Sequence, residues 1–201
     1  MTAVLTDEMQ VRMPAVEAET RQSRALHKVL GALRLLIGFE FVWAFVDKMW
    51  GLGFATEKAD AWVNGGNPTA GALWFGLKGP FKGFYESITG ASATFAADGT
   101  PLKLVPPHTW INYVYMGAML LIGLGLMTGV MTRLAAIGGI AWMTIFYTAT
   151  AIWPDYNPFY DEHILAIVVL VAIIIANAGA YIGLGKVWQR YEAVKKHPIL
   201  Y

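Results

Sequence analysis

Residues 29–46 read VLGALRLLIGFEFVWAFV, and they decide the fold because this long stretch holds only two charged residues, Arg34 and Glu40. At about 1.5 Å per residue, a helix of this length nearly crosses the roughly 30 Å hydrocarbon core of a bilayer. Three more apolar stretches follow, at residues 110–131, 134–153 and 164–183. The sequence therefore predicts an all-α integral membrane protein built as a four-helix transmembrane bundle.

The composition of the whole chain excludes several classes of protein. Of the 201 residues, 56% are hydrophobic and 14% are charged, whereas a soluble domain carries about 25% charged residues. The absence of cysteine excludes disulfides, thiolate chemistry, iron–sulfur clusters and covalently attached haem. The 15 basic residues nearly balance the 14 acidic ones, so the charge gives no indication of a nucleic-acid partner. The main partner that remains is the lipid bilayer.

The distribution of basic residues predicts the orientation of the chain. Lysine and arginine are concentrated in a polar arm at residues 1–28, in a tail at residues 186–201, and at Arg133 between the second and third spans. The turn between the third and fourth spans carries acidic residues instead. Because cytoplasmic loops are enriched in lysine and arginine, we expect a multi-pass protein of the cell membrane with both termini in the cytoplasm. Residues 47–108 then lie outside, and residues 29–185 form one membrane domain.

The external segment, residues 47–108, is rich in aromatic residues and glycine. Asn67 followed by Pro68 is typical of a helix N-cap with proline at the first helical position, which predicts a short helix over residues 68–77. A second short helix is expected over residues 81–88. Aromatic residues mixed with lysines are typical of helices that lie at the headgroup level. We therefore expect an aromatic-rich extracytoplasmic cap, which either only covers the bundle or closes a site.

Polar residues inside the first span are the first candidates for function, since a charge in the middle of a span costs about 2.5–3.5 kcal/mol. Glu40 and Asp47 are seven residues apart and lie on one helix face, with Trp43 beside them. We expect Glu40 to face the interior of the bundle and to bond with Tyr115, Tyr147 or a nearby threonine.

Arg34 is the other charge in this span, and its depth matches that of Asn177 on the fourth span. The sequence leaves two alternatives for its side chain. Arg34 contacts Asn177, or it extends along the helix to the cytoplasmic surface. In both cases a structural role is favoured for Arg34 taken alone.

The outer rim of the bundle offers a second group of candidates. An antiparallel bundle brings Asp47 and Lys48, at the end of the first span, to the level of Asp161, Glu162 and His163, at the start of the fourth. This cluster is either a functional pocket or a structural belt of ion pairs, in which exposed pairs contribute only about 0–1 kcal/mol. The D-x-H spacing is too common to indicate a metal site, and a single histidine near a span does not indicate a b-type haem.

Four short motifs in the same order resemble those of the DoxX/DoxD family of membrane proteins. They are Arg34-Leu-Leu-Ile-Gly38 followed by Lys48, Trp62-Val-Asn-Gly-Gly-Asn-Pro68-Thr, Gly129-Val-Met-Thr-Arg133-Leu-Ala-Ala136, and Asn157-Pro-Phe-Tyr-Asp161-Glu-His163. The resemblance covers roughly residues 30–190. The length of the external segment is similar to that of the DoxD side of the family, which is named for the large subunit of a thiosulfate:quinone oxidoreductase.

This resemblance implies a four-helix subunit that passes electrons from thiosulfate to quinone and forms tetrathionate. Quinone would then be a diffusible acceptor, and a protein partner in a membrane redox complex is expected. Some relatives in the family are described as membrane partners in redox or thiol-stress complexes. The alternative is therefore a non-catalytic anchor or accessory subunit that recruits such a complex.

Under the enzymatic hypothesis the residues fall into two groups. The catalytic candidates, which exchange protons with quinone or act at the rim, are Glu40, Asp47, Lys48, Asp161 and His163. The substrate-binding candidates, which include lysines that attract thiosulfate, are Arg34, Lys78, Lys82, Trp43, Tyr115, Tyr147 and Asn177.

Overall fold

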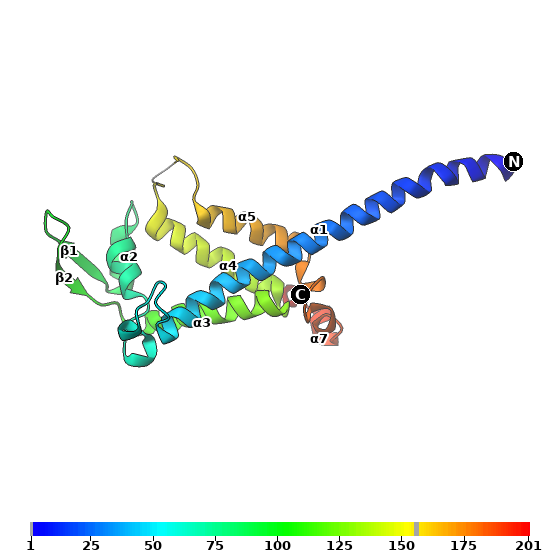
Figure 1. Ribbon diagram of the computed structural model, residues 1–201. Helices are drawn as coiled ribbons and strands as arrows, with labels where there is room; N and C mark the ends of the chain where they lie inside the picture. The colour runs from blue at the N-terminus through cyan, green and yellow to red at the C-terminus, as the bar shows by residue number, and fades with distance from the viewer. Residues whose placement is uncertain (1, 155–156) are drawn as a thin grey trace.

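The computed structural model describes residues 2–154 and 157–201 and is mostly helical (Figure 1). Its first element, α1 (Thr2–Trp50), is one continuous helix, so the predicted arm and the first predicted span form a single rod. The helix ends where Gly51 adopts φ 64° and donates its N–H to the carbonyl of Asp47 at 2.7 Å. Glycine takes this left-handed conformation without strain, so it closes the helix.

Two further long helices follow the segment of residues 51–108. They are α3 (Thr109–Thr128) and α4 (Thr132–Phe146), and α4 continues through a π-helical turn, η4 (Tyr147–Ala151). Three segments of the described chain are long and apolar enough to cross a membrane, namely Glu19–Trp50, Thr109–Thr128 and Thr132–Ala151. They lie over the first three predicted spans.

The fourth apolar helix is shorter than predicted. α5 (Glu162–Ile175) begins near the expected residue but stops well before residue 183. The helix cannot continue because Asn177 adopts φ 48°, after which the chain turns through η5 (Ala178–Ala180). At 1.5 Å per residue, α5 spans about 21 Å, which is less than the roughly 30 Å hydrocarbon core.

The remaining C-terminal residues fold back against the bundle. They form α6 (Gly185–Trp188), α7 (Glu192–Lys196) and η6 (Pro198–Leu200). The backbone N–H of Arg133 donates to the carbonyl of Tyr201 at 2.5 Å, and its guanidinium donates to the carbonyl of Pro198 at 3.0 Å. The C-terminus is therefore fixed beside the start of α4.

The core of the bundle lies where α1 packs on α3 and α4 packs on α5, with Phe41, Met119 and Leu170 fully buried. Close approach of α1 and α3 depends on glycine, because a Cβ at Gly123 would lie 2.6 Å from Cγ2 of Val42. Other large apolar side chains point outward; Leu121, for example, is 71% exposed. Small residues between helices and apolar residues on the outside are typical of helices that pack in lipid.

The segment of residues 51–108 contains the second predicted helix but not the first in the expected form. α2 (Lys82–Thr89) matches the expected residues 81–88 to within one residue at each end. Asn67 accepts the N–H groups of Thr69 and Ala70, as an N-cap does, but the turns that follow end in a short π-helix, η3 (Ala72–Gly76). Two more short 3₁₀ turns precede it, η1 (Lys58–Asp60) and η2 (Trp62–Asn64).

The fold is mostly helical, as predicted, but this segment also contains a β-hairpin that the sequence did not predict. β1 (Ser92–Phe95) pairs antiparallel with β2 (Pro101–Val105), with Ser92 opposite Val105. The turn contains Asp98-Gly99, a dipeptide that is a strong hairpin signal when apolar strands flank it. The hairpin and α2 gather at one end of the bundle, opposite the C-terminus (Figure 1).

Hydrogen bonds attach residues 51–108, called the cap from here on, to the long helices. The hydroxyl of Thr69 donates to Oδ1 of Asn112 on α3 at 2.6 Å, in a buried position. The backbone N–H of Lys78 donates to the carbonyl of Ala149 at 3.0 Å. The hydroxyls of Tyr85 and Thr148 are 2.6 Å apart. The cap is therefore fixed to both α3 and the end of α4.

A buried arginine holds the opposite end of the bundle together. Arg34 is 0% exposed, and its Nη1 donates to the carbonyl of Leu126 at 2.6 Å, while its Nη2 donates to the carbonyl of Ile182 at 2.6 Å. The predicted contact with Asn177 is wrong, because Asn177 lies beyond α5 and bonds with Gln189 at 3.1 Å. The surface alternative is also wrong, since the side chain stays inside the bundle.

Replacing Arg34 with leucine is expected to lower the free energy of unfolding by about 2–3 kcal/mol, because two buried carbonyls lose their donors. The measurement is the melting temperature of the purified protein in detergent. Arg24→Leu removes the same charge from an exposed position of the same helix and serves as the matched control. Equal melting temperatures for the two variants would show that the buried guanidinium contributes nothing to stability.

Candidate functional site

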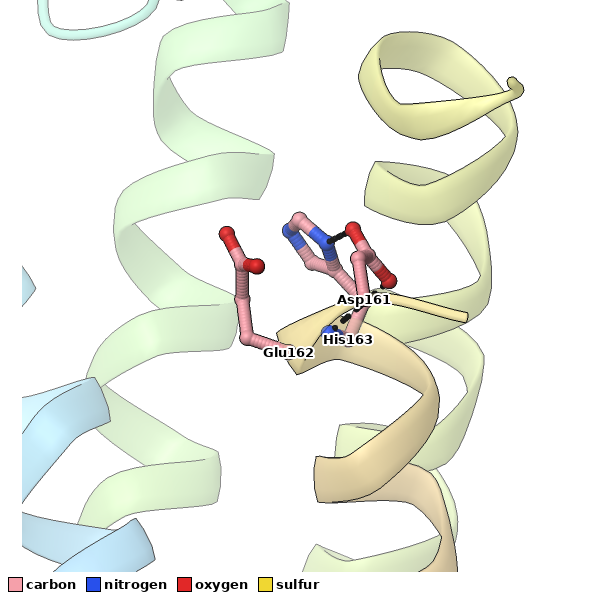
Figure 2. A group of neighbouring side chains, drawn as sticks. All are labelled: Asp161, Glu162 and His163. Atoms are coloured by element: carbon pink, nitrogen blue, oxygen red, sulfur yellow. Dashed lines mark hydrogen bonds and ion pairs between the residues drawn. The ribbon is translucent and has the colours of Figure 1, made fainter. Parts of the chain in front are cut away.

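An aspartate–histidine pair stands at the start of α5. Oδ1 of Asp161 accepts the backbone N–H groups of His163 at 3.1 Å and Ile164 at 3.4 Å, which makes Asp161 the N-cap of the helix. Oδ2 of the same carboxylate lies 2.5 Å from Nδ1 of His163 (Figure 2). A carboxylate on one ring nitrogen fixes the orientation of an imidazole and leaves the other nitrogen to exchange protons or bind a ligand.

Glu162 adds a second carboxylate beside this pair. One potential ligand atom from each of Asp161, Glu162 and His163 lies within 4.8 Å of the others. Figure 2 shows the Glu162 carboxylate on the side of the imidazole away from Asp161, near its second nitrogen. Among the described residues this potential metal-binding group has three members. Asp47 is not one of them, because its carboxylate accepts the N–H of Ala55. The group offers two proton acceptors around one imidazole.

Two cavities meet at Glu162 and His163. A polar cavity of about 490 Å³ is lined by these two residues together with Asp161, Lys78 and the loop before α5. An inner cavity of about 210 Å³ is lined by the same two residues and by α1, α3 and α4. The remaining residues of the inner wall are Glu40, Phe41, Ala44, Tyr115, Met119, Met143, Phe146 and Ala166. His163 and Glu162 therefore belong to both chambers.

Glu40 reaches this inner cavity in a way that the sequence did not predict. Its side chain is exposed and forms no hydrogen bond with Tyr115, Tyr147 or any other described residue, so the predicted bond is wrong. The reason is helical phase, since neighbouring residues differ by about 100° and it is Phe41 that packs into the core. Glu40 nevertheless lines the same cavity as Glu162 and His163.

A chain of rings connects Lys48 with the histidine. Nζ of Lys48 lies 5.9 Å from the ring centroid of Tyr115, within the range of a cation–π contact. The centroids of Tyr115 and Phe146 are 6.3 Å apart, and those of Phe146 and His163 are 5.8 Å apart. Lys48 is thus linked to the Asp161–His163 pair through aromatic rings and makes no ion pair with it.

Asp47 has a different role from the one predicted. It is 2% exposed, and its two carboxylate oxygens accept the backbone N–H groups of Ala55 at 2.9 Å and Phe54 at 3.3 Å. The predicted contact of Asp47 with Asp161 and His163 at the rim is wrong. The backbone of the loop after α1 donates hydrogen bonds to the Asp47 carboxylate instead. Asp47 fixes the first loop of the cap.

Most of the substrate-binding candidates make structural contacts away from His163. Lys78 lines the polar cavity with His163, as the rim hypothesis requires. Lys82 pairs instead with Glu86 on α2 at 3.8 Å. Trp43 packs against Phe54 with centroids 5.0 Å apart. The hydroxyl of Tyr147 donates to the carbonyl of Phe159 at 3.2 Å. Arg34 and Asn177 make the contacts described above. Of this group, Lys78 and Tyr115 line a cavity together with His163.

One residue that the structure places at the site was missed by sequence reasoning. Glu162 belonged to the predicted rim cluster, although it was not among the catalytic candidates. Phe146 gave no signal, because an aromatic residue in an apolar span is ordinary. Its place between Tyr115 and His163 follows from the packing of α4 on α3 and α5.

Comparison of the chain with protein-family models, with curated proteins and with solved structures finds no match. The function therefore has to be argued from the geometry of the site.

Asp161→Ala is expected to lower the free energy of unfolding by about 1 kcal/mol, because helix α5 loses its N-cap. Asp161→Asn keeps an oxygen for the cap and is expected to melt within a few degrees of the unaltered protein. Melting temperatures in detergent measure both effects. A fall of the same size in the two variants would mean that the contact with His163, and not the cap, provides the stabilisation.

Proposed function

We propose that this chain is a DoxX/DoxD-like membrane subunit that couples oxidation of a small sulfur compound, such as thiosulfate, to reduction of quinone. The single observation that carries the proposal is the Asp161–His163 pair, with Glu162 beside it, on the wall between a polar and an inner cavity. Reduction of a quinone needs protons as well as electrons. A carboxylate-oriented imidazole next to a second carboxylate is a suitable group for supplying them.

The overall reaction balances without a resident redox centre. Two thiosulfate ions each give up one electron and join through a new S–S bond as tetrathionate. The quinone takes up these two electrons and two protons and leaves as quinol. In our proposal His163 and Glu162 take protons from the polar cavity and pass them into the inner cavity, while Asp161 keeps the imidazole in position.

The charged side chains around the polar cavity support reduction of quinone better than they support binding of the thiosulfate anion. Lys78 lines the polar cavity, but Asp161 and Glu162 lie on the same wall and repel a dianion. Lys48 lines a separate cavity of about 590 Å³ under the cap, together with Glu57 and Asp60. Thiosulfate is therefore assigned on the family resemblance, and the proton-handling role on the geometry.

A second function, that of a membrane anchor for a redox complex, is supported by a different feature. The N-terminal part of α1 continues beyond the bundle as a helix, and no other element of the described residues lies beside it (Figure 1). A projecting helix of this kind suits contact with another protein. Under this proposal the chain recruits a respiratory or redox-stress partner and does not reduce quinone itself.

The membrane arrangement that we propose has four crossings, with α5 and the turns after it forming the fourth. Both termini then lie in the cytoplasm, and the aromatic cap lies outside the cell membrane. The distribution of lysine and arginine supports this orientation. So does the position of the cap, which lies at one end of the bundle while the N-terminal part of α1 and the C-terminus extend at the other (Figure 1).

The orientation is tested by single cysteines, since the chain has none of its own. Leu102→Cys, at a position that is 70% exposed in the hairpin, should react with a membrane-impermeant maleimide added to intact cells. Lys196→Cys, in the exposed tail, should react only after the cells are opened. The reverse pattern would place the cap in the cytoplasm.

The enzymatic proposal is tested by reconstituting the full chain in liposomes with decylubiquinone and thiosulfate and following quinone absorbance. His163→Gln should lower the rate by at least about a hundredfold, because a positioned acid–base group contributes about 10²–10⁴-fold. His197→Gln, in the exposed tail, is the matched control and should retain the full rate. If the unaltered protein reduces no more quinone than empty liposomes do, the anchor function is favoured.

A further inference from the structure

Two carboxylates without a partner line the inner cavity, whose volume is about 210 Å³. Glu40 belongs to α1 and Glu162 to the first turn of α5, and neither makes a hydrogen bond or an ion pair with any residue that the structure describes. Tyr115, 8% exposed on the same wall, likewise has no hydrogen bond with a described residue. The packing of the helices therefore brings two acidic side chains from distant parts of the sequence to one cavity.

Unpaired carboxylates are costly in this position. Glu40 lies within Glu19–Trp50, the first of the segments that are long and apolar enough to cross a membrane. A charge inside such a span costs about 2.5–3.5 kcal/mol, and the carboxylates found there are normally paired or mark a path for ions. The wall of the inner cavity contains no lysine or arginine from the described part of the chain. A bound cation or a proton is therefore needed to balance these charges.

The imidazole of His163 is held in the orientation that metal-binding histidines adopt. Its Nδ1 lies 2.5 Å from Oδ2 of Asp161, and Figure 2 shows the other ring nitrogen, Nε2, on the side of Glu162. Histidines that bind metals almost always bond their second nitrogen to a carboxylate or a carbonyl, which fixes the tautomer and the ring. The side chains of His163 and Asp161 are only 17% and 12% exposed, so their contact differs from an ordinary surface ion pair.

We propose that the inner cavity binds a divalent transition-metal ion of the zinc type, with Nε2 of His163 and the carboxylates of Glu162 and Glu40 as ligands. Asp161 is then a positioning residue, which holds the imidazole and does not touch the ion. Imidazole and carboxylate groups both bind zinc, whereas magnesium prefers oxygen ligands alone. Two carboxylates and one divalent cation are together neutral, which removes the cost of the charges. The spacing of Asp161 and His163 does not indicate this site; the addition of Glu40 from another helix does.

The metal ion gives the same site a means of regulation. A metal ion on Nε2 of His163 occupies the nitrogen that exchanges protons in the proposed function, so metal binding and proton transfer exclude each other. This consequence rests on the proposed function, whereas the binding of the ion does not. A proton on one of the carboxylates is the other way to balance their charge, and the test separates the two.

The test titrates zinc chloride into the full chain, purified without a histidine tag and stripped of metal with EDTA, by isothermal titration calorimetry. Asp161→Asn keeps an oxygen for the helix cap and should raise the Kd about 10- to 100-fold, as the loss of an orienting partner does. His163→Gln, Glu162→Gln and Glu40→Gln each remove a ligand and should raise it at least as much. The matched controls, which should bind as the unaltered protein does, are His197→Gln and Glu192→Gln in the exposed tail.

Magnesium chloride is the second titrant and should bind at least about tenfold more weakly, because the imidazole favours zinc. Glu40 is exposed, so its replacement leaves the fold intact even if a change at His163 does not. The inference is overturned if the unaltered protein binds no zinc, if magnesium binds as tightly as zinc, or if Glu40→Gln binds zinc as the controls do.

Quinone reduction in liposomes separates this inference from the proposed function. Zinc should slow the reaction of the unaltered chain, and EDTA should restore it. Zinc binding with the expected pattern, but without thiosulfate-dependent reduction in the presence of EDTA, rejects the proposed function and leaves the metal site standing. Quinone reduction by a chain that binds no zinc rejects the metal site and leaves the proposed function standing.

Discussion

The guanidinium of Arg34 is the contact on which the arrangement of the helices depends. It is completely buried, and it joins the carbonyl of Leu126, near the end of α3, to the carbonyl of Ile182, in the turns after α5. Carbonyls near a helix C-terminus lack intrahelical donors, and a cation there is favoured by the helix dipole. Gly129 leaves the room for it, because a Cβ at that position would lie 2.7 Å from Nη1. One side chain thus fixes three segments of the bundle at the end opposite the cap.

The cavities lie at the end of the bundle opposite Arg34. The start of α5 carries the Asp161–His163 pair, and the N-cap role of Asp161 means that the contact that begins the helix also orients the imidazole. Hydrogen bonds join the cap to α3 and to η4, the turn that continues α4. Stability and the candidate chemistry are therefore located at opposite ends of the same helices.

The three chambers differ in what they need from a ligand. The polar cavity has carboxylates and an imidazole that exchange protons, and the inner cavity shares two of these groups. A third cavity, of about 360 Å³ between α2 and the long helices, is lined mostly by apolar side chains.

The sequence alone determined the helices, because long apolar segments with few charges fit lipid and little else. It also placed Asp161 and His163 together, since N-caps and their neighbours are local. It failed where contacts connect distant residues. Whether Glu40 has a hydrogen-bond partner depends on the rotation of α1 relative to α3, which places Phe41 in the core. The carboxylate of Asp47 is bonded to the backbone of a loop that no sequence pattern predicted. The length of α5 was decided by the left-handed backbone of Asn177.

The chambers themselves were decided only by the tertiary structure. Tyr115, Trp142 and Phe146 read as ordinary aromatic residues of apolar spans, and nothing in their spacing distinguishes a paired donor from an unpaired one. That distinction depends on which groups from α2, α3 and α4 meet across the cavity. Local sequence specifies where a helix begins and which face is apolar, whereas hydrogen-bond satisfaction is a property of the packed whole, because each donor finds its acceptor on another element.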